Sequence, residues 1–513
     1  MKATDTGCVS FTLTPTLSLR ERETWFRRRS CPHAPGLSAG LDDDFHDMRT
    51  HWIWLLLVWF LAGASVAWAA DEGPQLPPHR RVALANGLTL LLLEQHEVPL
   101  VSVQIVVRAG GVADPAGKEG LALLTAELLR RGTQRRTADQ IASELDFIGG
   151  TLEIGGDPDR VFLASEFMKK DTGAALDLLS DLLRHPGFPD AEVEKLIRQQ
   201  VDGIKQAKEE ARAVLPHYFA AALFGRHPYA RPPEGDERSL ASIRREDVAA
   251  CYEHLYGPET TLLAVAGDFV SAEMERVLAE KLGDWKSRGR PGTPLPPSPA
   301  PVQGRKLLLV NKPDSPQTYF AIGNVGIARH HPDRTGVELI NLLFGGRFTS
   351  MLNEALRVNS GLTYGARSRF EQHRVAGPFA LSSFTANATT VKAIDLALEV
   401  LQTLHRDGVS EGQLRSAKDY YKGQFPPRIE TTDQLAALLG DLEFYGLDER
   451  EVNGLFRRIE AFTTADARRI IDRHFPREHL VFALIGKAAE IEAAVKHYAP
   501  QIERREIEQP GFQ

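Results

Sequence analysis

The sequence predicts an α+β protein of two homologous lobes, each an antiparallel sheet with helices packed on one face. Three observations indicate this fold class. The chain has 513 residues, more than one compact domain usually holds. A proline-rich segment divides the chain after residue 70 into halves of nearly equal length. Each half contains the same order of apolar strands and amphipathic helices, a mixture that is typical of α+β lobes.

The order of elements is the clearest sign of duplication. Both halves have a strand, a helix, a second helix and a final strand, in that order. In the first half these are expected at 101–111, 120–130, 246–256 and 260–269, and in the second half at 318–327, 335–346, 465–475 and 479–486. Longer helices are expected at 174–185 and 391–408, because apolar residues there recur at i, i+3, i+4 and i+7. A first strand is expected within 81–94.

Composition separates the lobes and excludes one class of function. Residues 289–304, GRPGTPLPPSPAPVQG, contain six prolines and three glycines, which predicts an extended linker. We assign the N-terminal lobe to 71–288 and the C-terminal lobe to 305–513. The net charge is −7, so the chain has no basic excess to neutralise phosphates, and we expect no nucleic acid among its partners.

The first 70 residues are predicted to lie outside the fold. An apolar run, WIWLLLVWFLAGA, covers 52–64 and is followed by the small-residue pattern Ala67-Trp68-Ala69. With Arg49 before it, the run is typical of a secretory signal peptide, so we predict a signal over 48–70 and an exported, periplasmic location. An uncleaved membrane anchor is the alternative, although the run is shorter than the roughly 20 residues that span a bilayer.

A signal that begins at Met48 is unusual, because signal peptides normally stand at the start of a chain. Residues 1–47 show no helical or strand periodicity, and we interpret them as an extension wrongly included in the gene model. Cys8 and Cys31 lie in that extension. Cys251 would then be the one cysteine of the mature chain, without a disulfide partner, and we expect it to be buried and inert.

The helix at 120–130 begins a segment that bears on chemistry, GLALLTAELLRRGT. This segment resembles the active-site helix of the insulinase/pitrilysin zinc metallopeptidases, G-L-A-H-x-x-E-H followed by G-T. In that family the two histidines bind zinc and the glutamate is the general base. The resemblance places the histidines on Leu123 and Glu127 and the glutamate on Ala126. Leucine has no lone pair, alanine cannot accept a proton, and one carboxylate does not make a zinc site.

No other residues of the N-terminal lobe are expected to replace the missing zinc ligands. The family's remaining carboxylate ligand would fall on Asp202 or Gly203, where paired glutamates are usual. His185, His217 and His227 do not stand at ligand spacing from one another. We therefore predict that this chain has no catalytic residues of its own and binds neither a metal nor another cofactor.

The C-terminal lobe keeps a different signature. Residues 344–365, FGGRFTSMLNEALRVNSGLTYG, resemble the family's second-lobe motif, and Arg357 and Tyr364 match its paired Arg and Tyr. In family members these side chains reach the substrate beside the zinc. A guanidinium and a phenol can donate hydrogen bonds to a carbonyl and stabilise its oxyanion. The structural alternatives are an arginine that favours a helix C-terminus and a strand tyrosine packed on a neighbour.

The resemblance runs from residue 81 to residue 500 and implies a function. Some family members act as pairs of unlike chains, one with the zinc motif and one with the Arg/Tyr motif. We hypothesise that this chain is the non-catalytic subunit of such a heterodimeric peptidase, that it binds peptide partly by strand addition, and that it supplies Arg357 and Tyr364 to a zinc-bearing partner. The chain would be inactive alone, and it would meet a membrane only if its signal stays uncleaved.

Two alternatives belong to other classes of protein. The chain could be an inactive peptide-binding or assembly scaffold, since fold alone does not determine function. It could also be an enzyme with an unrelated site, but the sequence contains no P-loop, nucleophile elbow or Ser/His/Asp signature.

Overall fold

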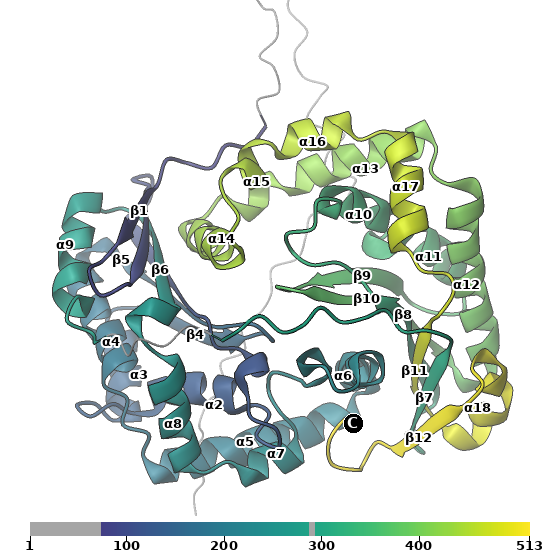
Figure 1. The fold of residues 1–513 in the computed structure, drawn as a ribbon, viewed down its shortest axis with the longest axis horizontal. Helices are drawn as coiled ribbons and strands as arrows, with labels where there is room; N and C mark the ends of the chain where they lie inside the picture. The colour runs from purple at the N-terminus through teal and green to yellow at the C-terminus, as the bar shows by residue number, and fades with distance from the viewer. Residues whose placement is uncertain (1–72, 287–292) are drawn as a thin grey trace, which may run out of the picture. The chain divides into compact units, whose positions relative to one another are not determined.

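The computed structural model describes residues 73–286 and 293–513. These residues form two six-stranded sheets with helices packed around them (Figure 1). The extension and signal peptide predicted for 1–70, and residues 289–292 of the linker, lie outside the described residues. Residues 293–304 contain neither helix nor strand. No helix in the described part of the chain is long and apolar enough to cross a membrane.

The sheet of the N-terminal lobe has the order β1-β2-β6-β3-β5-β4. Its strands are β1 (Arg80–Ala83), β2 (Thr89–Glu94), β3 (Leu100–Val107), β4 (Thr151–Gly156), β5 (Val161–Met168) and β6 (Thr261–Gly267). All neighbouring strands are antiparallel except β2 and β6, because the chain returns to β6 after a long helical excursion. The expected first strand within 81–94 is divided between β1 and β2, which form a hairpin.

The sheet of the C-terminal lobe repeats this arrangement, with the order β12-β7-β11-β8-β10-β9. Its strands are β7 (Lys306–Asn311), β8 (Gln317–Val325), β9 (Ala366–Gln372), β10 (Ala376–Ala386), β11 (Val481–Gly486) and β12 (Ile502–Glu506). Strand β7 runs parallel to β11 and β12. The predicted two-lobed α+β class is confirmed, and the parallel pairs make both sheets mixed.

Helices occupy the six predicted ranges, and further helices that the sequence reading did not place lie between them. Those of the N-terminal lobe are α2 (Leu121–Leu128), α3 (Ala138–Phe147), α4 (Thr172–Arg184), α5 (Asp190–Glu209), α6 (Ala211–Phe224), α7 (Glu237–Ser242), α8 (Arg245–Leu255) and α9 (Ser271–Leu282). Those of the C-terminal lobe are α10 (Arg334–Asn341), α11 (Met351–Asn353), α12 (Thr390–Asp407), α13 (Glu411–Gln424), α14 (Thr432–Tyr445), α15 (Arg450–Asn453), α16 (Leu455–Ala461), α17 (Thr464–His474) and α18 (Ala488–Val495). Cys251 is buried in α8, as predicted, and burial raises its pKa to about 12, so the thiol is unreactive.

Each sheet is also covered on its second face by a helix from the other lobe. Helix α14 of the C-terminal lobe lies against β3 and β6, and helix α6 of the N-terminal lobe lies against β8 and β11. The consecutive leucines of β2 show the consequence. Leu90 and Leu92 join the large core that contains α4 and α5, whereas Leu91 and Leu93 pack with Leu439 of α14. A strand that is buried on both faces is apolar throughout rather than alternating.

A buried polar cluster further joins the lobes. The carboxylate of Asp159, in the turn between β4 and β5, accepts hydrogen bonds from the Tyr229 hydroxyl at 2.8 Å and from the backbone N–H of Arg374 at 2.7 Å. Beside it, Arg160 pairs with Asp441 of α14 at 2.6 Å. Because Arg374 and Asp441 belong to the C-terminal lobe, these contacts fix one lobe against the other.

Candidate functional site

Helix α2 is held at its start by a glycine and an aspartate. Gly120 has φ of +93°, and a Cβ there would stand 2.7 Å from the carbonyl oxygen of Glu234, so only glycine fits. The buried carboxylate of Asp114 accepts the N–H groups of Gly120 at 2.7 Å and Ala122 at 2.8 Å, which caps the helix. Burial raises the pKa of Asp114 to about 7, against the opposing effect of these hydrogen bonds. The matched G-L-A positions therefore fix the helix geometry.

The three degenerate zinc positions lie on this helix as the spacing predicts. Leu123 and Glu127, one turn apart, are half-buried and face the same way, whereas Ala126 is 0% exposed. Leu123 lies beside the edge strand β4, since a Cβ on Gly156 would be 3.3 Å from its Cδ1 atom. Glu127 accepts a hydrogen bond from Nε2 of Gln200 on α5 at 3.2 Å.

This set of side chains does not fit a zinc ion. An aliphatic group, a methyl group and a single carboxylate offer one ligand residue where a zinc site needs at least three. The side chain of α5 that contacts Glu127 is Gln200, which offers an amide and not a carboxylate. Asp202, where the resemblance would place a further ligand, is exposed and pairs with Lys205 at 3.6 Å, and the space beside Gly203 is open.

Of the three histidines that the sequence offers as ligands, His217 and His227 have other partners. His217 pairs with Glu234 at 2.9 Å. His227 accepts the backbone N–H of Tyr229 through Nδ1 at 3.1 Å, and its Nε2 lies 2.8 Å from the carbonyl oxygen of Pro297 in the linker. His185 follows the last turn of α4, where burial lowers its pKa. The structure does not bring these side chains together.

The Arg/Tyr segment contains two π-helical turns, Leu342–Gly346 after α10 and Glu354–Asn359 after α11. Such turns are frequent at functional sites. Arg357 is half-buried in the second turn, and its guanidinium lies 4.6 Å from the ring centre of Phe348. Tyr364 is 82% exposed in the loop before β9, so it is not a packed strand residue. Among the described residues, no hydrogen bond joins the two side chains.

Tyr364 lies at a cavity between the lobes, and Arg357 does not line it. We call this space of about 410 Å³ the α6 cavity. Leu215, Phe219 and Ala220 of α6 form one wall, and β8, β9 and β10 form the other. Its counterpart in the duplication, the α14 cavity of about 320 Å³, lies among α14 and strands β3, β4 and β5.

Both cavities lie beside an edge strand. Among the strands of residues 73–286 and 293–513, β9 pairs only with β10, and β4 pairs only with β5. The outer edge of each strand therefore presents backbone N–H and C=O groups that can pair with an added strand. A cavity, an open strand edge and an exposed phenol are together suited to bind an extended peptide.

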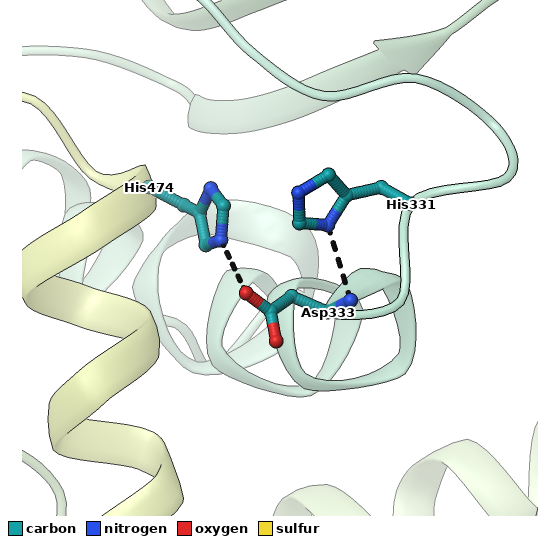
Figure 2. Close-up of side chains that lie close together, drawn as sticks. All are labelled: His331, Asp333 and His474. Carbon is teal, nitrogen blue, oxygen red and sulfur yellow. Dashed lines mark hydrogen bonds and ion pairs between the residues drawn. The ribbon is translucent and has the colours of Figure 1, made fainter.

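In the described part of the chain, one cluster has the residue types of a metal site, namely His331, Asp333 and His474 (Figure 2). Its donors are already engaged. The Asp333 carboxylate accepts from His474 Nε2 at 2.8 Å and from Arg469 at 2.7 Å, and His331 Nδ1 accepts the backbone N–H of Asp333 at 3.1 Å. The cluster joins the start of α10 to the end of α17. Sequence reasoning missed it, although the run His330-His331-Pro332-Asp333 before a predicted helix was a visible signal.

The charges of this cluster are determined by its contacts. Partial burial alone would raise the pKa of Asp333, but the hydrogen bonds from His474 and Arg469 lower it to about 2. Burial also lowers the pKa of His331 and of His474, which keeps both imidazoles neutral at neutral pH. Asp333 is thus a carboxylate already neutralised by arginine.

The duplicated fold and the residues of α2 define a metallopeptidase-like protein whose zinc positions lack ligands. Family models support this class. The model described as insulinase (peptidase family M16) matches residues 89–237, and the model described as peptidase M16 inactive domain matches residues 242–421. The chain belongs to the insulinase, or M16, family.

Relatives agree with this assignment. An uncharacterized zinc protease of Mycobacterium leprae is 26% identical over 75% of this chain and 86% of its own length. A protein of Helicobacter pylori named as a non-peptidase homolog is 22% identical over 77% of this chain and 90% of its own length. A crystal structure titled as a peptidase M16 inactive domain from Pseudomonas fluorescens has the same fold, with a TM-score of 0.75 and 23% identity over 80% of this chain and 98% of that chain.

Proposed function

We propose that this chain is the non-catalytic subunit of a two-chain zinc peptidase and that it binds peptide for a zinc-bearing homologous partner. One observation carries the proposal. In the N-terminal lobe Leu123, Ala126 and Glu127 stand in place of the three zinc-motif residues, whereas the C-terminal lobe has Arg357 and, at the α6 cavity, an exposed Tyr364. A guanidinium and an exposed phenol are the groups that can donate hydrogen bonds to a substrate carbonyl, which supports a role beside a partner's zinc.

Inactivity of the isolated chain follows from the chemistry of water. Water has a pKa near 15.7, and zinc lowers it to about 7, which makes hydroxide available at neutral pH. Leu123 and Ala126 supply neither a ligand nor a base. The chain therefore hydrolyses no peptide bond unless another chain contributes the metal.

The contribution of this chain would be binding and charge stabilisation. A substrate added to the edge of β9 pairs through its backbone, so recognition tolerates many sequences. Arg357 and Tyr364 would then donate hydrogen bonds to the substrate carbonyl beside the partner's zinc. The exposure of Tyr364 supports this role, since its hydroxyl is free to reach a second chain. Export through the predicted signal at 48–70 would place this chain in the periplasm, where a zinc-bearing partner with its own signal could meet it.

Reconstitution tests the proposal. The mature chain and a zinc-bearing homologue from the same genome are purified separately and mixed, and hydrolysis of a quenched fluorescent peptide is followed. We expect activity only in the mixture. Arg357→Ala and Tyr364→Phe should each lower kcat/KM by about 10²- to 10³-fold, as loss of one oxyanion donor does. Arg415→Ala and Tyr420→Phe are matched controls, because both residues are exposed on α13 and line neither cavity.

Two results would contradict the proposal. Chelator-sensitive hydrolysis by the isolated chain would show that it holds its own zinc. Equal activity of the Arg357, Tyr364 and control variants in the mixture would leave the chain as a peptide-binding or assembly scaffold.

A further inference from the structure

Three arginines line the α6 cavity, and among the described residues no carboxylate forms an ion pair with any of them. Arg212 comes from α6, and Arg367 and Arg369 come from alternate positions of β9, so both strand side chains stand on the face toward the cavity. All three are exposed. Within the described chain none forms an ion pair, and Arg367 has only a long contact of 3.5 Å to the Ser382 hydroxyl. In the described part of the chain, Glu371 is the one carboxylate that lines the cavity.

This concentration of positive charge runs against the rest of the molecule. The chain has a net charge of −7, and Arg136, for comparison, contacts three carboxylates. Partial burial lowers the pKa of Arg367, repulsion from Arg212 and Arg369 lowers it further, and attraction by Glu371 opposes the shift without reversing it. An anionic group that entered the cavity would relieve this repulsion and gain charge-assisted hydrogen bonds.

The duplicated cavity carries the opposite charge. Glu153, Glu166 and Asp433 line the α14 cavity, and no arginine or lysine among the described residues does so. Both cavities lie between an edge strand and a helix of the other lobe, so the fold alone does not require either sign. The sign at each cavity is a property of its side chains, which indicates that the α6 cavity is adapted to one class of ligand.

Much of the remaining lining of the α6 cavity is apolar. Leu215 and Phe219 of α6 face Tyr319 and Phe384, whose rings stack at 5.3 Å. The register places Arg367 opposite Ser382 and Arg369 opposite Ala380, both of which also line the cavity. A peptide strand along β9 would thus set its side chains over an apolar wall with guanidinium groups at the edge.

We propose that the α6 cavity is a specificity subsite for acidic peptide segments. An Asp or Glu carboxylate of the peptide pairs with Arg367 and Arg369, and a bulky apolar side chain beside it packs against Phe219 and Tyr319. The inference rests on the proposed function in taking peptide as the ligand. It needs neither the partner nor hydrolysis, so it can be tested on the mature chain alone.

Direct binding provides the test. Three fluorescein-labelled nonapeptides differ only in their central residue, Glu, Gln or Lys, which is followed by Phe, and their Kd values are measured by fluorescence anisotropy. We expect the Glu peptide to bind about 10- to 100-fold more tightly than the Gln peptide and the Lys peptide to bind most weakly. The preference for Glu should shrink between 0.05 M and 0.5 M salt, because exposed charges are screened.

Variants identify the residues responsible. Arg367→Gln and Arg369→Gln, alone and combined, should remove most of the Glu preference and leave the Gln peptide unaffected, whereas Arg367→Lys should restore part of it. Arg367→Glu with Arg369→Glu should reverse the order in favour of the Lys peptide. Arg415→Gln, an exposed arginine on α13, is the matched control and should change nothing. Thermal unfolding of each variant confirms that it is folded.

The outcomes separate this inference from the proposed function. Equal binding of the Glu and Gln peptides, or a Glu preference that survives the double Gln variant, would overturn the subsite and leave the two-chain peptidase standing. If none of the three peptides binds, the subsite is also overturned. Selective binding of the Glu peptide by a chain that never activates a zinc-bearing partner would support the subsite and contradict the proposed function.

Discussion

Leu123 and Glu127 are the two positions at which substitution could restore zinc binding. Both are half-buried and one turn apart on α2, so Leu123→His with Glu127→His would present two imidazoles in the same direction. Adding Gln200→Glu would supply a carboxylate from α5, where Gln200 now contacts position 127. We expect the triple variant to bind one zinc per chain, as measured by calorimetry and metal analysis.

Matched variants limit how that result can be explained. Leu123→His alone should bind zinc weakly, because one imidazole beside Glu127 leaves the site short of ligands. The unchanged chain should return free of zinc after dialysis against micromolar metal. Stoichiometric zinc in the unchanged chain would show that the loss of the ligands on α2 did not abolish metal binding.

The Asp333 carboxylate should make the stability of the fold depend on pH. Its pKa is about 2 in the folded chain and 3.8 in the reference state, so the charged form stabilises the fold above pH 4. That contribution is about 2 kcal/mol at pH 7, falls to about half at pH 3, and disappears as the pH drops through 2.

Urea unfolding of Asp333→Asn measures this effect. The difference in unfolding free energy from the unchanged chain should be about 2 kcal/mol at pH 7 and should shrink toward pH 3. Asp419→Asn, at an exposed position on α13, is the control and should show no such difference. A constant difference between pH 7 and pH 3 would mean that Asp333 does not titrate with its partners.

Sequence and structure contribute differently at this scale. That Leu123 cannot bind a metal follows from the sequence alone, because a leucine lacks a lone pair whatever the fold around it. The contacts of Asp333 with Arg469 and His474 were not predictable, because these residues lie far apart in the chain and meet only when α17 packs against α10. The arginine cluster of the α6 cavity was not predictable for the same reason, since Arg212 and Arg367 belong to different lobes.

At the scale of elements, the periodicity predicted helices and strands but not which sheet each helix would cover. An amphipathic stripe shows that a helix is buried on one side, and it does not name the surface opposite. The uninterrupted leucines of β2 were the available signal, because burial on both faces requires a second layer. That layer is α14, which follows β2 by more than 300 residues.

Gly440 is where α14 approaches its sheet. A Cβ there would stand 3.3 Å from Cγ of Gln104 and 3.4 Å from Cγ2 of Val106, both on β3. We expect Gly440→Val to push the helix off the sheet and to lower the unfolding free energy by about 1–3 kcal/mol, as overpacking does. Gly412→Val on α13 is the matched control, because nothing lies within 4 Å of that position.

Chemical unfolding of both variants checks this prediction. Valine has a higher helix propensity than glycine, so Gly412→Val should be neutral or slightly stabilising. Equal stabilities for the two variants would show that α14 is not tightly packed against β3.

At the scale of the whole molecule, α6 and α14 each pack on the sheet of the other lobe, so each lobe contributes to the core of the other. Leu215 and Phe219 of α6 share a cluster with Val481 and Ala483 of the C-terminal sheet. Leu435 and Leu439 of α14 pack with the N-terminal sheet. The two lobes can therefore be separated along the sequence but not in their packing.

This reciprocity predicts how the two halves behave when the linker is cut. Residues 71–288 expressed alone would expose the face of their sheet that α14 covers, and residues 305–513 would expose the face that α6 covers. We expect each half alone to aggregate or to remain partly unfolded, because a large exposed apolar face favours association. Coexpressed halves should form one stable 1:1 complex on size-exclusion chromatography, since the buried contacts do not depend on a continuous linker. If each half is monomeric and cooperatively folded in isolation, the lobes are independent domains. The α6 and α14 helices would then not be needed to complete the core of the other lobe.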